Sequence, residues 1–144
     1  MRVLNSLLSF VARLCLAAVF IFAGASKIIF YDQTAQYMAS KGMTMVPIFL
    51  IGAAIVELVG GLSLVLGYKT RFGAAILLLF LIPTTLIFHD FWNATGAEAV
   101  VQQINFLKNL AIFGGLLYVL CHGCGGCSFD SCCCRSKMPP ENKM

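Results

Sequence analysis

The sequence predicts an all-α integral membrane protein, folded as an antiparallel bundle of four transmembrane helices. Of its 144 residues, 60% are hydrophobic and 11% are charged, and the mean hydropathy is +0.89. A soluble domain of this length cannot bury so much apolar surface. Four windows approach the ~20 apolar residues that cross ~30 Å of hydrocarbon. They cover about residues 7–30, 46–67, 72–92 and 104–121.

Each window predicts a helix rather than a strand, because its apolar residues are continuous, whereas a lipid-facing β-strand alternates over about ten residues. Helix breakers separate the windows. Gly42 and Pro47 precede the second, Gly67 follows it, and the NATGAEA segment at 93–99 separates the third from the fourth. Connections this short make neighbouring helices antiparallel. We expect one membrane domain over residues 1–120, followed by a Cys-rich tail.

The N-terminus has a second interpretation. Two arginines, an apolar run over residues 14–22 and the small residues AGA at 23–25 resemble a secretory signal and its cleavage site. Against it, Arg13 lies deep in this segment and the apolar character continues past Lys27. The first window is therefore expected to remain as a membrane helix.

Basic residues at the ends of the windows predict the orientation. With the N-terminus inside, most of them fall on the cytoplasmic side, where positive charge is favoured. The net charge of +4 comes mainly from this set, so it indicates membrane orientation and no nucleic-acid partner. Both termini are expected to be cytoplasmic. The inside set is Arg2, Lys69, Arg71, Arg135, Lys137 and Lys143, against Lys41 and Lys27 outside.

Ionisable side chains inside the windows are expected to face the bundle interior. At ~1.5 Å per residue, Glu57 lies about 15 Å and Arg13 about 9 Å above the cytoplasmic ends of their helices, so we predict that they pair. Lys27 and Lys108 fall near the outer boundary, where a second polar cluster is expected with His89, Asp90 and Trp92. Alternatively, these charges only hold the bundle together, and Trp92 is an interfacial anchor.

Five segments follow one another along the chain: FIFAGASK (20–27), YMASKGM (37–43), ELVGGLSLVLGYKTR (57–71), LIFHDFW (86–92) and NFLKNLAIFGGLL (105–117). In this order and spacing they resemble the DoxX family of small four-helix bacterial membrane proteins. The resemblance implies a bacterial inner-membrane protein and a redox accessory role, since the family is named for a subunit of an archaeal thiosulfate:quinone oxidoreductase. The polar positions matching its pattern are Glu57, His89, Asp90, Asn105, Lys108 and Asn109.

These matched positions lead to a hypothesis about the site. Lys108 with Asn105 and Asn109 would hold a quinone carbonyl or a small anion, and the ammonium would stabilise negative charge that develops on reduction. His89 or Asp90 would pass the proton. The protein would then be an accessory subunit of a quinone-linked or thiol and oxidative-stress system, with other redox subunits as partners.

The alternative function is a non-catalytic membrane scaffold or a small-solute binding protein. A nucleotide cofactor is not expected, because the chain contains no GxGxxG or Walker-type loop.

Six of the seven cysteines crowd into CHGCGGCSFDSCCCR, residues 121–135. A C-x2-C-x2-C spacing is typical of iron–sulfur ligation, and a cytoplasmic position disfavours disulfides. The tail would therefore hold a soft metal, such as Zn or Cu(I), or an iron–sulfur cluster; acylation and no specific role are the alternatives. The candidate ligands are Cys121, His122, Cys124, Cys127, Cys132, Cys133 and Cys134.

Overall fold

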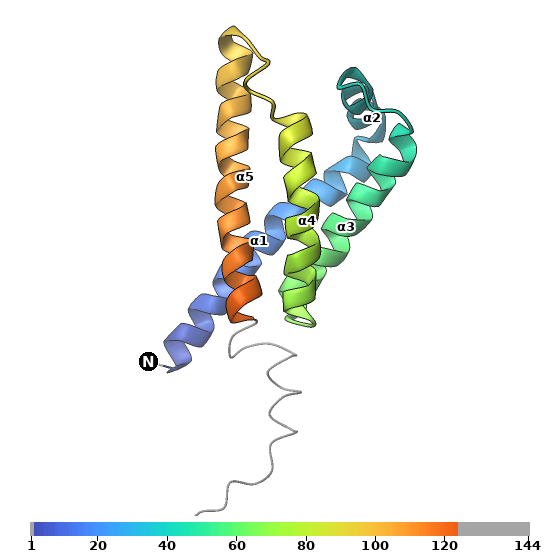
Figure 1. The fold of residues 1–144 in the computed structure, drawn as a ribbon. Coiled ribbons are helices and arrows are strands. Elements are labelled where there is room, and N and C mark those ends of the chain that lie inside the picture. The colour runs from blue at the N-terminus through green and yellow to red at the C-terminus, as the bar shows by residue number, and fades with distance from the viewer. Residues whose placement is uncertain (1, 124–144) are drawn as a thin grey trace, which may run out of the picture.

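The computed structural model describes residues 2–123, and within this range all of the regular secondary structure is helical (Figure 1). Four of its helices, α1, α3, α4 and α5, are long and apolar enough to cross a membrane. The predicted fold class, an all-α helical membrane bundle, is therefore confirmed. The helices are α1 (Arg2–Ile29), α2 (Tyr31–Ser40), α3 (Val46–Leu66), α4 (Thr70–Phe88) and α5 (Gly96–His122).

The helix ends differ from the predicted windows where polar residues are helical. The last helix begins at Gly96 rather than at 104. A search for apolar runs misses its polar N-terminal part, although polar residues there are compatible with a helix. Glu98 lies in that turn, where a negative charge is favoured by the helix dipole. At the other boundary, α4 ends at Phe88 rather than at 92. The residues that follow form the turn into α5.

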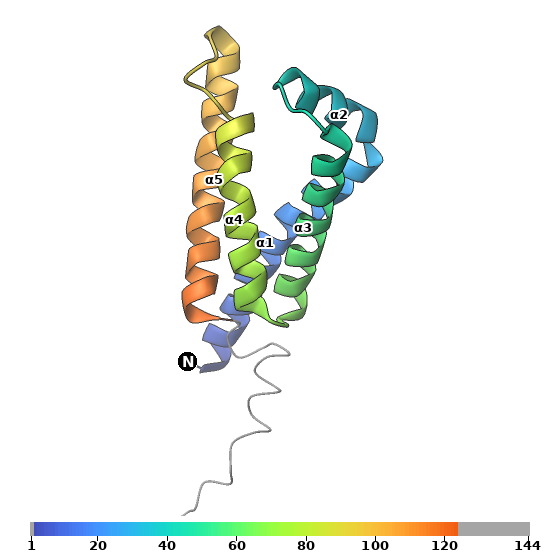
Figure 2. The same ribbon diagram turned by 45° about the vertical axis from the view of Figure 1, so that its right-hand side comes forward.

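Helix α2 is absent from the prediction because it is short and too polar to form a membrane window. It follows α1 after a single residue, Phe30, whose carbonyl accepts a hydrogen bond from Thr34 Oγ1 at 2.9 Å. The N-terminus and the end of α5 lie at one end of the bundle, and α2 lies at the other (Figures 1 and 2). We call the latter the distal end; it also includes the α2–α3 connection and residues 89–95.

Glycines allow α1, α3 and α4 to pack closely. A Cβ at Gly61 would lie 2.8 Å from Ile21 Cγ1 and 3.3 Å from the Ala17 carbonyl oxygen, so α1 and α3 meet nearly backbone to backbone. A Cβ at Gly60 would lie 2.5 Å from Leu77 Cγ on α4. Small residues at helix interfaces are typical of membrane bundles, where close approach maximises van der Waals contact. Helix α5 packs mainly along α4 (Figure 2).

Candidate functional site

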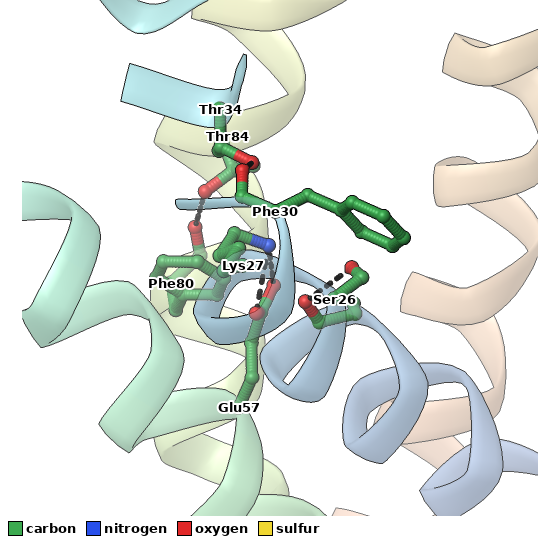
Figure 3. A network of polar contacts seen from close by, with 8 residues as sticks. Ser26, Lys27, Phe30, Thr34, Glu57, Phe80 and Thr84 are labelled. Atoms are coloured by element: carbon green, nitrogen blue, oxygen red, sulfur yellow. Dashed lines mark hydrogen bonds and ion pairs between the residues drawn. The ribbon is translucent and has the colours of Figure 1, made fainter. Parts of the chain in front are cut away.

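A buried ion pair joins α1 to α3 below the distal end. Lys27 Nζ donates to both carboxylate oxygens of Glu57, at 2.9 Å to Oε1 and 2.8 Å to Oε2 (Figure 3). The Glu57 side chain is 5% exposed and that of Lys27 is 20% exposed. The two opposite charges therefore neutralise each other, and the lysine is the more accessible partner.

The predicted pairing of Glu57 with Arg13 is wrong. Arg13 is buried and donates from Nη1 to the Leu64 carbonyl at 3.2 Å, while Lys27 occupies both oxygens of Glu57. Arg13 therefore meets α3 seven residues beyond Glu57, about 10 Å along the helix at ~1.5 Å per residue. Counting residues from the predicted start of the helix gave the wrong depth for Arg13 relative to Glu57. The count failed because α1 begins at Arg2 rather than near residue 7 and runs obliquely across the bundle (Figure 1).

A cavity of about 420 Å³ opens above the ion pair at the distal end, between α1, α2, α3 and α4. Its walls are mainly apolar and aromatic. Lys27 lines the cavity and Glu57 does not, so the ammonium stands between the carboxylate and the space. Figure 3 shows the pair with neighbouring hydroxyl side chains. The polar lining residues are Ser26, Lys27, Thr34, Tyr37, Thr84 and His89.

The hydroxyl groups in this lining have already used their donors. Ser26 and Thr84 each donate to a carbonyl of their own helix at 2.9 Å, and Thr34 donates to the carbonyl of Phe30, just before α2, at 2.9 Å. Tyr37 donates from its hydroxyl to the Phe88 carbonyl at 3.2 Å. An ammonium has three donors, and Glu57 takes two of those on Lys27, so one N–H is left. That N–H is the hydrogen-bond donor these contacts leave for a ligand.

His89 supplies an acceptor on the same cavity. Its Nδ1 lies 3.1 Å from Oε1 of Gln102, which is buried on α5. Because an amide oxygen only accepts, Nδ1 donates in this contact, and in the neutral ring Nε2 then keeps a lone pair. Gln102 was not among the predicted site residues. The signal was its seven-residue spacing from Asn109, which places both on one face of α5.

The structure divides the predicted quinone site. Asn109 donates from Nδ2 to Thr85 Oγ1 at 3.0 Å and lines a separate groove of about 180 Å³ between α4 and α5. Asn105 is half-buried on the same helix, but Lys108 is exposed, so the prediction that it points into the bundle is wrong. Successive helix positions differ by ~100° around the axis, so the face that brings Asn109 to α4 turns Lys108 away.

Asp90 lies at the surface of the distal end, where its Oδ1 accepts a hydrogen bond from Lys41 Nζ at 2.7 Å. This bond holds the pKa of Asp90 below its ordinary value and raises the pKa of Lys41. Trp92 is exposed and packs edge-on against Phe91 and Phe106. The predicted outer cluster is thus divided: Lys27 and His89 line the cavity, Asp90 pairs with Lys41 outside it, and Trp92 packs in an aromatic group.

Residues 2–123 contain no group of three or more His, Cys, Asp or Glu side chains placed to hold a metal ion. Cys121 is exposed, and His122 stacks on Tyr118. The remaining predicted ligands, Cys124, Cys127, Cys132, Cys133 and Cys134, lie outside the described residues.

The fold and site together define a small multi-pass helical membrane protein with an ion pair beneath a cavity at one end. The chain belongs to the DoxX family, whose model matches residues 8–90, from α1 to the residues just after α4. The resemblance noted in the sequence is therefore confirmed.

Two curated relatives are inner membrane proteins of Escherichia coli (strain K12). The chain is 35% identical to inner membrane protein YphA over 120 residues, covering 83% of this chain and 86% of the relative. It is 38% identical to inner membrane protein YqjF over 121 residues, covering 83% and 87%. A more distant relative, the ER-derived vesicles protein ERV29 of Saccharomyces cerevisiae, is 25% identical over 107 residues, or 69% of this chain and 34% of the relative. No solved structure matches the chain.

Proposed function

We propose that this inner-membrane protein binds the head group of a membrane quinone in the distal cavity and acts as an accessory subunit of a quinone-linked oxidoreductase system. The observation that carries the proposal is the pairing of apolar walls with one lysine N–H at the base of the cavity. The volume of about 420 Å³ lies within the ~300–1,000 Å³ typical of small-molecule sites. An isoprenoid tail would extend between the helices into lipid.

The charge balance of the site favours a neutral carbonyl over a free anion. Glu57 neutralises Lys27, so an anion entering the cavity would bring an unmatched charge among mainly apolar side chains. A carbonyl oxygen accepts the remaining lysine N–H without adding charge. When electrons reach the bound head group, the same ammonium stabilises the negative charge that develops there.

His89 is placed to handle the accompanying proton. Gln102 holds the ring by Nδ1, which leaves Nε2 for a ligand. In the neutral ring, Nε2 would accept a hydrogen bond from a hydroxyl of the reduced head group and would take that proton when the head group is oxidised; when the head group is reduced, Nε2 protonated from water at the distal surface would return the proton. The two oxygens of the reduced ring match this arrangement, because one can accept from Lys27 while the hydroxyl at the other end donates to His89.

Titration of a short-chain quinone into the purified protein in nanodiscs tests this proposal. Lys27→Gln should weaken binding because it removes the ammonium, and His89→Phe should weaken binding of the reduced form more than that of the oxidised form. Lys108→Gln is the matched control, since Lys108 is exposed away from the cavity. Equal affinities for all four proteins would refute the site.

We also propose that the distal end faces the periplasm, with both chain ends in the cytoplasm. The excess of basic residues at the opposite end supports this orientation. A reporter that is active only in the periplasm, fused to the C-terminus, tests this orientation. An active fusion would contradict it.

A scaffold function is the second candidate, and the completeness of the Lys27–Glu57 contact favours it. Both carboxylate oxygens are bonded within the protein, so the pair needs no ligand to be satisfied. The double variant Lys27→Met with Glu57→Leu separates the two functions. A scaffold keeps its activity in cells if the helices still pack, whereas a quinone site loses it.

A further inference from the structure

Helix α2 forms the roof of the distal cavity. Thr34, Tyr37 and Met38 on α2, and Met43 in the connection that follows, all line the space. Met38 is the buried residue of this helix, so most of α2 faces away from the protein. Because so little apolar surface holds it down, α2 belongs to the part of the fold that opens at low free-energy cost.

Two contacts tie this roof to the opposite wall. Lys41 Nζ, one residue past the end of α2, is 2.7 Å from Asp90 Oδ1. The Tyr37 hydroxyl donates to the Phe88 carbonyl at 3.2 Å, and the two rings pack with centroids 5.8 Å apart. Asn93 donates to the second Asp90 oxygen at 3.4 Å. The Lys41–Asp90 and Tyr37–Phe88 contacts therefore join the α2 side of the cavity to the α4 side, whereas the Asn93 bond lies within residues 89–95 and orients Asp90.

The chain on either side of α2 is built like a pair of hinges. A single residue, Phe30, separates α1 from α2. On the other side, Gly42 has φ +79° and Met45 has φ +57°. The left-handed conformation is readily available to glycine but uncommon for methionine, so rotation at Met45 would relieve local strain. Helix α2 can therefore move as a unit about its two ends.

We propose that α2 is a lid over the cavity and that the Lys41–Asp90 ion pair is the latch that holds it closed. Opening separates α2 from the end of α4 and connects the cavity with the distal surface of the membrane. Both latch residues are partly exposed, at 20% and 23% of their side chains, so water competes with the pair and the latch is reversible. The inference rests on the cavity used in the proposed function but not on the identity of its ligand.

Cysteine reactivity measures opening directly. In a full-length chain whose native cysteines are replaced by serine, Ala53→Cys places a thiol in the cavity wall. The protein in nanodiscs, without added quinone, is treated with a charged thiol reagent. Asp90→Asn and, separately, Lys41→Gln should each raise the labelling rate of this thiol roughly threefold, the scale of one partly exposed ion pair. Exchanging the two charges, Lys41→Asp with Asp90→Lys, should restore the slow rate.

The control thiol is Gln36→Cys, on the exposed face of α2, whose rate should be the same in every background. The lid is refuted if the Ala53→Cys rate is unchanged by both single substitutions, or if the charge exchange stays as fast as Asp90→Asn. Because the labelling experiment contains no quinone, faster labelling in the latch variants would support the lid even if the protein did not bind quinone. Conversely, unchanged labelling would refute the lid and leave the result of the quinone titration unaffected.

Discussion

Removing either partner of the Lys27–Glu57 pair should destabilise the fold, and the two losses should differ. Lys27→Met leaves a carboxylate that is 5% exposed with its charge unmatched, which should cost about 3–5 kcal/mol. Glu57→Leu leaves an ammonium that is 20% exposed and lines the cavity, where water can reach it. Its loss should cost only about 1–3 kcal/mol, as for an unsatisfied polar group.

The double variant should be close to the wild type, because replacing a buried ion pair by apolar residues is often neutral. The coupling free energy between the two positions should therefore approach the sum of the two single losses, about 4 kcal/mol or more. Unfolding by SDS titration in mixed micelles, followed by circular dichroism, measures all four proteins. Additive losses would refute the pair, and a larger loss for Glu57→Leu than for Lys27→Met would refute the relative exposure of the two charges.

The same cycle with Arg13 discriminates between the two possible partners of Glu57. Arg13 contacts α3 at Leu64, about 10 Å from the level of Glu57 at ~1.5 Å per residue. Substitutions this far apart should add within about 0.5 kcal/mol. Strong coupling of Arg13→Leu with Glu57→Leu would show that the register of α1 against α3 is wrong.

Three further predictions concern packing, pH and the tail. Gly60→Ala should cost about 1–3 kcal/mol, because its Cβ would lie 2.5 Å from Cγ of the fully buried Leu77; Gly114→Ala, with nothing within 4 Å, should be neutral or slightly stabilising in the same SDS titration. The pKa of Asp90 is lowered and that of Lys41 raised, so the latch should contribute fully between about pH 4 and pH 10. Its contribution is lost as the pH falls through the lowered pKa of Asp90 or rises through the raised pKa of Lys41. Lid opening, followed by fluorescence quenching of a dye in the cavity, should therefore stay constant from pH 5 to 9 and increase only below about pH 4 or above about pH 10. Elemental analysis should find a soft metal in the whole chain and none after truncation at residue 120, and equal near-zero metal in both would end that hypothesis.

The sequence predicted the membrane spans well because continuous apolar runs have few alternatives to a helix in lipid. It did not predict α2, since a ten-residue polar helix produces neither a hydropathy window nor a long amphipathic pattern. The sequence therefore did not predict the lid or its latch, although it placed both Lys41 and Asp90 on the outer side of the membrane. Only the tertiary fold brings them together.

The site was predicted in part, and the errors share one cause. Lys27, Glu57 and His89 were all chosen, but depth along a helix axis gave the wrong partner for Glu57 because the tilt and crossing of α1 are not encoded in residue spacing. The spacing of Asn105, Lys108 and Asn109 places them on one broad face of the helix. The spacing does not determine which side of this face contacts the neighbouring helix. Asn109 meets Thr85 on α4 and Gln102 meets His89 just past its end, and this face of α5 turns Lys108 outward.

The quinone content of the purified protein tests most directly whether the distal cavity holds a quinone. Ala53→Leu fills the cavity from its wall, whereas Gly52→Leu adds the same side chain at the neighbouring position, where a Cβ meets nothing within 4 Å. Each protein is purified in mild detergent, and its lipid extract is quantified by chromatography with optical detection. The wild type and Gly52→Leu should carry quinone near one molecule per chain, and Ala53→Leu should carry almost none. Quinone at trace levels in all three, or at equal levels in all three, would contradict the proposed site.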